Sequence, residues 1–170
     1  MKWFLLTILF ACAGAVPAAE SLSGGVAPSV AGGPWLNSPP LDVNALRGRV
    51  VLVEFWTYGC FNCRHVEPHI KQWWHQYAPS GLMVVAVHAP EFAAERELTK
   101  VAAYVRSEGI GYPVVLDNDF AIWRRFANKY WPTLYLIDRQ GRLRYRHIGE
   151  GDYAPTQRWI ERLLSEHATK

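Results

Sequence analysis

The chain has 170 residues, of which 50% are hydrophobic and 14% aromatic, with 18 Lys and Arg against 15 Asp and Glu. This length favours one domain with its own core, and the basic residues are scattered among acidic ones, which argues against a nucleic-acid partner. Three cysteines, at positions 12, 60 and 63, are too few for the spaced pairs of a disulfide-stabilised secreted protein.

The first 19 residues are predicted to be a signal peptide. A single Lys2 precedes an apolar run at 3–16, and "VPAAE" supplies the small residues of a cleavage site near position 18 or 19. The run is shorter than the roughly 18 to 20 residues of a membrane span. We therefore expect an exported protein, periplasmic or otherwise extracytoplasmic. A permanent membrane anchor and a lipoprotein attached through Cys12 remain alternatives.

The segment 20–34 is rich in Gly, Ser, Pro and Ala and nearly free of charge, which predicts a flexible linker. The domain proper is expected at 35–170. Its first strong signal is "VVLVEFW" (50–56), which is too short for a helix and typical of a strand buried on both faces. The next segment, 61–78, has apolar residues at helical spacing, and Pro68 is expected to kink this helix.

The rest of the chain alternates in the same way. We expect a strand at 82–88, an amphipathic helix at 93–109, a strand at 113–117, a helix at about 119–129, two strands within 133–149 joined as a hairpin at "DRQG", and a last helix within 154–168. This order indicates an α/β fold with a central mixed β-sheet flanked by helices. The cysteines then follow a central strand, at the carboxyl end of the sheet, where open α/β folds place their chemistry.

Several short motifs occur together and in order on these elements. They are "WLNSPPL", "EFWTYGCFNC", "VHAPEF", "YWPTLYLIDRQGRLRY" and "GEGDY", and Pro68 follows the second cysteine by five residues. With these motifs, residues 35–167 resemble the thioredoxin superfamily, in particular its exported TlpA-like branch and the thioredoxin-like domain of DipZ proteins. The resemblance implies a thioredoxin-like fold and a thiol:disulfide oxidoreductase with a redox-active disulfide, Cys60–Cys63, and no cofactor or metal.

The two cysteines are expected to divide the chemistry. Cys60 falls at the amino end of a helix, where unpaired N–H groups and the helix dipole favour a thiolate, so it is the predicted nucleophile. Cys63 lies one turn further in and is the predicted resolving thiol, which attacks a mixed disulfide at Cys60 and releases the reduced partner. A structural cysteine pair or half of a zinc site is the alternative, although zinc normally takes four ligands.

Glu54 is a carboxylate inside the apolar strand, at the position where thioredoxin-like proteins carry a buried acid beneath the cysteines. Burial should raise its pKa and let it shuttle the proton of Cys63. The alternative is an acid at the end of the sheet that binds a nearby base.

The segment "YWPT" is predicted to bind substrate. Pro132 corresponds to the superfamily's cis-proline, and such a bond turns the backbone of Trp131 outward, where it can pair with an extended substrate segment. Simple packing is the alternative for Trp131. Phe61 and Tyr58 are expected to shape the surface around the cysteines, and Trp56 either does the same or belongs to the core.

Three histidines are weaker candidates. His65 and His69 are four residues apart, but "HVEPH" lacks the order of the zinc-protease motif H-E-x-x-H, so surface positions are expected. His65 also comes one residue too late for the C-x-x-C-H of covalent haem attachment. His88 ends the second predicted strand, where a role near the site stays open.

Two other function classes stay open. Thr57 gives the T-x-x-C of a peroxiredoxin-like thiol peroxidase, although Val53 replaces the proline of that family. A copper carrier of similar fold would use C-x-x-x-C, one residue longer than the spacing here. We expect protein thiol and disulfide partners, a membrane electron donor and, by default, a monomer. Phe61 and Asn62 add no positive charge between the cysteines, which favours a reductant of exported protein disulfides or apocytochrome thiols.

Overall fold

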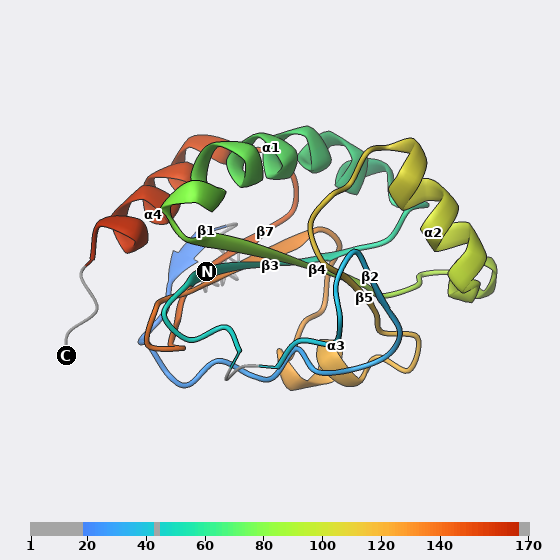
Figure 1. Cartoon of the computed structure of the whole chain (residues 1–170), viewed down its shortest axis with the longest axis horizontal. Helices are drawn as coiled ribbons and strands as arrows, with labels where there is room; N and C mark the ends of the chain where they lie inside the picture. Colours follow the sequence, from blue (N-terminus) through green and yellow to red (C-terminus); the bar gives the residue numbers. More distant parts are fainter. Residues whose placement is uncertain (1–18, 43–44, 167–170) are drawn as a thin grey trace, which may run out of the picture.

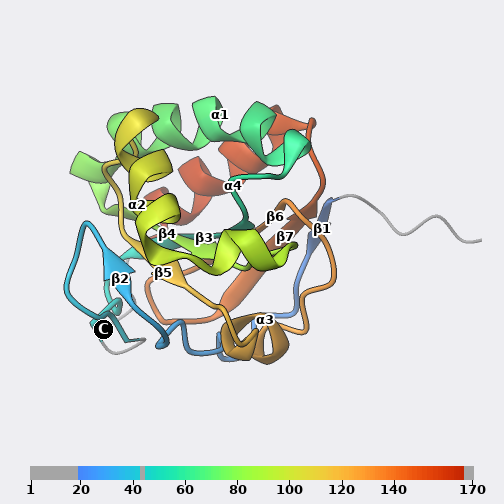
Figure 2. The same cartoon turned by 90° about the vertical axis from the view of Figure 1, so that its right-hand side faces the viewer.

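The computed structural model describes residues 19–42 and 45–166. These residues form one sheet with helices on both faces (Figure 1, Figure 2). The strands are β1 (Ala19–Ser21), β2 (Trp35–Leu36), β3 (Val50–Trp56), β4 (Leu82–His88), β5 (Val114–Leu116), β6 (Thr133–Ile137) and β7 (Leu143–Ile148). The helices are α1 (Phe61–Tyr77), α2 (Leu98–Ser107), α3 (Ala121–Arg125) and α4 (Tyr153–Ser165), with 3₁₀ turns η1 (Ala78–Ser80) and η2 (Ala93–Arg96). None of the described helices is both long and apolar enough to cross a membrane.

The strand that leads to the cysteines lies in the middle of the sheet. The strand order is β1-β7-β6-β3-β4-β5-β2, in which β3, β4 and β5 run parallel and the other neighbours pair antiparallel. All seven residues of β3 are buried, as expected for a strand covered on both faces. The segment after β3 therefore leaves the sheet from a rigid, central position.

Each face of the sheet has its own hydrophobic core. One face is covered by α1, α2 and α4, and the core there includes both cysteines, Trp56 and Trp73. The other face is covered by α3 and by the chain before β3, and its core is built around Phe55. Figure 1 and Figure 2 both show α1 and α4 side by side on one face and α3 on the other. This arrangement confirms the predicted mixed sheet flanked by helices.

Two predicted helices are shorter in the structure. The segment 93–109 begins as the 3₁₀ turn η2, and α2 starts only at Leu98, because Glu97 has extended backbone angles. The helix expected at 119–129 is confined to α3, since Ala127 takes a positive φ of 48° that ends the helical turn. In contrast, α1 continues through Pro68 to Tyr77.

The expected flexible linker at 20–34 is instead packed against the domain. β1 pairs with β7, and a single bridge joins Val26 to Arg142. Val30 is 1% exposed and belongs to the core on the α3 face. The glycines allow this packing, because a Cβ atom at Gly33 would lie 2.0 Å from the carbonyl oxygen of Leu116. The small residues reflect close approach to the sheet.

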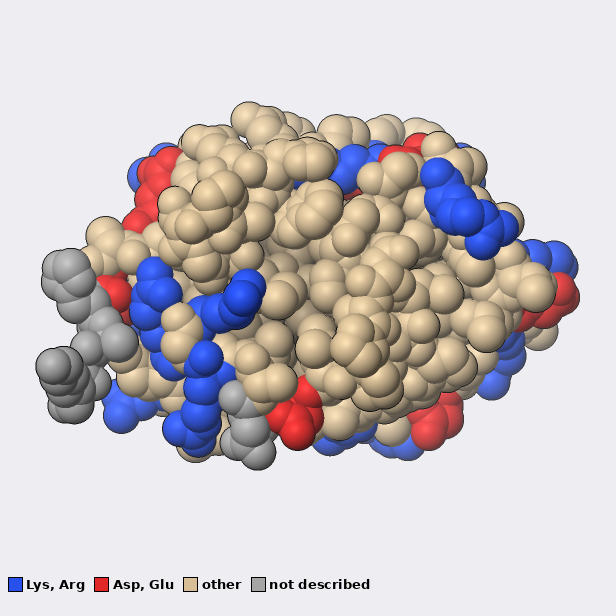
Figure 3. Space-filling view, viewed as in Figure 1, with Lys and Arg blue, Asp and Glu red and all other residues tan. Residues whose placement is uncertain are grey.

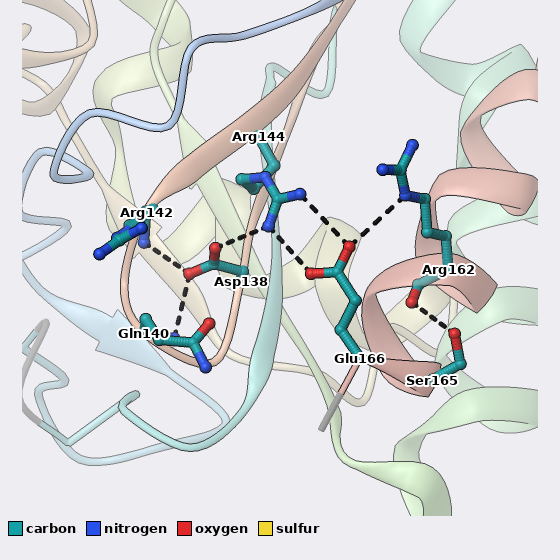
Figure 4. A network of polar contacts seen from close by, with 7 residues as sticks. All are labelled: Asp138, Gln140, Arg142, Arg144, Arg162, Ser165 and Glu166. Atoms are coloured by element: carbon teal, nitrogen blue, oxygen red, sulfur yellow. Dashed lines mark hydrogen bonds and ion pairs between the residues drawn. The ribbon is translucent and has the colours of Figure 1, made fainter. Parts of the chain in front are cut away.

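A charged network fastens the β6–β7 turn to the end of α4. Lys and Arg side chains gather over this turn on the face drawn in Figure 3. The close view in Figure 4 shows Arg144 between two carboxylates, 2.9 Å from Asp138 Oδ2 and 2.9 Å from Glu166 Oε2. The other oxygen of Asp138 accepts the backbone N–H groups of Gln140 and Arg142. One arginine thus links the hairpin to the last helix, at the turn between β6 and β7 and away from the cysteines.

Candidate active site

The first feature of the site is the start of α1, which follows the carboxyl end of β3. Cys60 is the N-cap of α1, and its sulfur accepts the backbone N–H of Cys63 at 3.1 Å. An N-cap atom that accepts a helix N–H occupies the end where the helix dipole favours negative charge. This position suits a sulfur atom that has to carry charge as a thiolate.

The two cysteines are bonded to each other. The Cys60–Cys63 disulfide joins Cα atoms 5.3 Å apart, and both residues are buried. Phe61, between them, is 70% exposed, and its ring meets His65 edge-on. An accessible aromatic side chain therefore lies next to a nearly covered disulfide.

Glu54 is buried in β3 below this segment. No hydrogen bond or ion pair to its carboxylate occurs among the residues that the structure describes. Burial, and to a lesser extent the negative charge of Glu67, raise the pKa of Glu54 to about 8. A raised pKa of this kind suits a group that exchanges a proton slightly above neutral pH, and the role of Glu54 as a proton shuttle for Cys63 stays a prediction.

The second acid, Glu67, was not predicted to belong to the site. It lies four residues after Cys63 on α1, accepts the hydroxyl of Tyr104 at 2.9 Å and pairs with Lys71 at 2.5 Å. Its negative charge raises the pKa of Glu54. The i,i+4 spacing from Cys63 places Glu67 on the same side of the helix as that cysteine and is the signal that could have found it.

The Trp131–Pro132 peptide bond is cis. Pro132 directly precedes β6, whose first residue pairs with Phe55 of β3, so the proline lies beside the end of the strand that leads to the cysteines. Trp131 is half-buried, donates its indole N–H to the carbonyl of Ala89 at 3.0 Å and packs on Trp123 with ring centroids 4.3 Å apart. Packing thus accounts for the Trp131 side chain, and its backbone remains a candidate for binding substrate.

A cluster of aromatic rings, which we call the aromatic wall, packs around the residues that precede Cys60. Tyr58 stacks on His88 at 5.7 Å and on Tyr104 at 5.9 Å, and its hydroxyl donates to the carbonyl of Ala94. Trp56 is buried and meets His88 edge-on. Tyr58 therefore ties the segment before Cys60 to the turn after β4.

His88 is fully buried in this wall. Its Nε2 lies 3.1 Å from the hydroxyl of Thr57, and that hydroxyl donates to Glu95 at 2.8 Å. Because the one hydroxyl hydrogen is used on Glu95, the His88 Nε2–H is the donor to Thr57. Burial lowers the pKa of His88 to about 4, so the ring is neutral near pH 7. His88 thus supports the cysteine segment through Thr57.

The other two candidate histidines lie outside this cluster, on α1, where His65 is exposed and His69 is partly buried. His65 pairs with Glu150, and His69 stacks on Tyr153 with ring centroids 3.5 Å apart. Burial lowers the pKa of His69. Within 19–42 and 45–166, no three His, Cys, Asp or Glu side chains are grouped closely enough to bind a metal ion.

Comparison with known proteins places this geometry in a family. A profile of the AhpC/TSA family matches residues 33–146. Protein DipZ of Mycobacterium bovis is 44% identical over 153 residues, which cover 88% of this chain and 22% of DipZ. The chain therefore spans about a fifth of the length of that relative. The thiol-disulfide oxidoreductase YkuV of Bacillus subtilis is 27% identical over 132 residues, 78% of this chain and 88% of YkuV.

The fold agrees with these matches. The solution structure of a thioredoxin-like protein in the oxidised form has a TM-score of 0.77 and 27% identity, covering 85% of this chain and 98% of that protein. The resemblance to the thioredoxin superfamily and to DipZ proteins is thus confirmed at the level of sequence and fold. The match covers the strand that leads to the cysteines, the cysteines themselves and the segment around Pro132. The chain therefore belongs to the AhpC/TSA family and has the thioredoxin-like fold.

Proposed function

We propose that the chain is a thiol:disulfide oxidoreductase whose reduced Cys60/Cys63 dithiol attacks disulfides of protein partners, releases them as thiols and is itself oxidised to the Cys60–Cys63 disulfide. The observation that carries this proposal is the disulfide at the start of α1, with the sulfur of Cys60 accepting a helix N–H. YkuV, of which the chain covers 88%, is named for the same activity. Cys60 is the attacking thiolate, and Cys63 resolves the mixed disulfide.

The arrangement favours disulfide exchange over peroxide reduction. In the T-x-x-C pattern of a thiol peroxidase, the Thr57 hydroxyl would be offered to the peroxide. Here it is buried, donates to Glu95 and accepts from His88. Both hydrogen-bonding directions of the hydroxyl are thus used inside the protein.

We also propose that the protein acts as a reductant. The two basic residues that follow the cysteines in sequence make no hydrogen bond to the Cys60 sulfur among the described residues: the Arg64 guanidinium donates to the carbonyl of Tyr58, and His65 pairs with Glu150. The helix start is then the main stabilising group, so the dithiol gives up its electrons readily. A reductant of this kind needs a donor in an oxidising compartment, and we assign this role to a membrane protein.

The proposed location is outside the cytoplasm, in the periplasm or its equivalent. Its support is the signal-peptide pattern of residues 1–19, most of which lie outside the described part of the chain. The proposed substrates are disulfides of exported proteins or of apocytochromes.

Turnover with a protein disulfide tests the proposal. With dithiothreitol as the electron source, the wild type should accelerate reduction of the insulin disulfides well above the rate with dithiothreitol alone, and Cys60→Ser should lose this acceleration. Consumption of hydrogen peroxide is measured in parallel. Rapid peroxide consumption with no insulin reduction would overturn the proposal in favour of a peroxidase.

A further inference from the structure

A buried carboxylate on the turn after β4 contacts the segment that carries the cysteines. Glu95 is 3% exposed, and its Oε2 accepts the hydroxyl of Thr57 at 2.8 Å and the backbone N–H groups of Glu91 at 2.7 Å and Phe92 at 3.1 Å. No ion pair to Glu95 occurs in the described part of the chain. All three contacts donate to the carboxylate, which suits its ionised form.

The other oxygen of Glu95 lies against the residue before Cys60. A Cβ atom added at Gly59 would lie 2.0 Å from Glu95 Oε1, far inside van der Waals contact. Only glycine leaves room for the Glu95 carboxylate at this position. The requirement is for space and not for backbone conformation, because φ of Gly59 is outside the left-handed region. The absence of a side chain at Gly59 thus lets the Glu95 carboxylate lie against the residue that directly precedes the proposed nucleophile, Cys60.

Thr57 links this carboxylate to Cys60 through the backbone. The carbonyl of Thr57 accepts the N–H of Cys60 at 3.2 Å, and its side chain lies between Glu95 and His88. The turn from Thr57 to Cys60 is therefore held at both ends, by its own backbone bond and by the buried hydroxyl.

We propose that Glu95 is a positioning residue of the active site, which holds the Cys60 turn through Thr57 and places a negative charge with no paired cation in the described part of the chain beside the start of α1. This inference rests on the proposed function and deepens it. The charge opposes the effect of the helix N-terminus on the Cys60 thiolate, and a less stable thiolate makes the dithiol a stronger reductant.

Alkylation of Cys60 as a function of pH tests this role. In a background with both Cys12→Ser and Cys63→Ser, the rate with iodoacetamide reports the thiolate of Cys60 alone. Glu95→Gln should lower the midpoint of this profile by about one pH unit, because it removes a charge close to the thiolate. Glu91→Gln, an exposed acid on the same turn, should leave it unchanged. Both variants keep the other ionisable groups near the turn, which include Glu54 on β3, Tyr58 on the turn itself, His88 on β4, Arg64, His65 and Glu67 on α1, and Tyr104 on α2.

A second variant, Thr57→Val, tests the effect of the Glu95 charge on the Cys60 thiolate even if Glu95→Gln does not fold. Thr57→Val keeps the shape of the side chain and removes the hydroxyl that partly neutralises Glu95, so the midpoint should move upward. A Glu95→Gln midpoint equal to or above that of Glu91→Gln, or a Thr57→Val midpoint at or below wild type, would overturn the inference. Alkylation needs no protein partner, so a failure of the insulin assay alone would concern the proposed function and leave this test intact.

Discussion

At the scale of single residues, the two sulfur atoms have different surroundings. The sulfur of Cys60 accepts the N–H of Cys63 at the helix start, whereas Cys63 lies within the first turn of α1 and is the more buried of the two core cysteines, 3% exposed against 8%. The first environment favours a thiolate, and the second favours a neutral thiol that ionises only when its proton has an acceptor.

This difference predicts the behaviour of two serine variants. Cys60→Ser should abolish exchange with protein disulfides. Cys63→Ser should still attack them and accumulate as a mixed disulfide, because the resolving thiol at position 63 is absent. Mass spectrometry of each variant after incubation with a disulfide peptide measures the adduct. An adduct on Cys60→Ser, or normal turnover of Cys63→Ser, would reverse the two assignments.

Glu54 predicts a pH dependence of the second step. With a pKa raised to about 8, its carboxylate is the proposed acceptor of the Cys63 proton, so release of the mixed disulfide should accelerate as pH rises through this value. Glu54→Gln should slow release several-fold near pH 8 and remove this inflection. Glu67→Gln should move the inflection to lower pH, since it removes the charge that helps to raise the pKa. Rapid-quench measurement of peptide release follows both.

Glu54→Gln should also change how the free energy of unfolding depends on pH, in a direction that the raised pKa defines. The folded protein keeps a proton on Glu54 that the unfolded chain loses between about pH 4.5 and pH 8, so the free energy of unfolding should fall by several kcal/mol across this window. In Glu54→Gln this decrease should be absent. Urea unfolding at several pH values measures it, and an equal decrease in both proteins would return Glu54 to a structural role.

The candidate site residues that could be predicted from the sequence are those that lie close to the cysteines along the chain. The helix start at Cys60 and the buried acid six residues earlier are local features of one strand and one helix. Glu95 is different, because its bond to Thr57 spans 38 residues and exists only once η2 packs against the turn after β3. A single sequence carries no period or motif that reports such a contact.

At the scale of elements, the central strands could be predicted and the edges could not. β3 and β4 are apolar runs apart from Glu54 and the terminal His88, and their bounds match the expected 50–56 and 82–88. β1 and β2 have only three and two residues, too few for a pattern to show. Their pairing is decided by the neighbouring strands β7 and β5.

The arginine network at the end of α4 predicts a stability difference between two substitutions. Arg144→Met leaves the buried carboxylate of Asp138 without its cation and should cost about 1 to 3 kcal/mol. Arg162→Met removes an exposed partner of Glu166 and should cost less than about 0.5 kcal/mol. Urea unfolding at low ionic strength measures both. Equal effects would show that Arg144 contributes no more than a surface ion pair.

At the scale of the whole molecule, the segment before β2 belongs to the folded domain. Its composition suggested a linker, but small residues also suit a chain that runs close along a sheet. Two valines in this segment differ strongly in burial, since Val30 is 1% exposed and Val26 is 84% exposed. Substitutions at these two positions can therefore test whether the segment is packed on the domain or flexible.

Replacing Val30 or Val26 by aspartate tests this packing through the stability of the protein. Val30→Asp buries a charge in the core beneath α3 and should destabilise the protein by about 3 kcal/mol or more. Val26→Asp should change stability by less than about 0.5 kcal/mol. Thermal unfolding compares the variants. A Val30→Asp protein as stable as Val26→Asp would mean that this segment does not pack on the domain.

The redox potential is the property of the whole molecule on which the proposed direction of electron flow depends. The helix start is proposed to stabilise the Cys60 thiolate, neither Arg64 nor His65 donates a hydrogen bond to the Cys60 sulfur in the described part of the chain, and Glu95 is proposed to oppose the thiolate. Equilibration of the purified protein with glutathione buffers, read by tryptophan fluorescence, measures the midpoint of the Cys60–Cys63 couple. We predict a value between roughly −200 and −270 mV, at the reducing end of this superfamily, whereas a midpoint above about −150 mV would contradict the reductant and make the protein a disulfide donor.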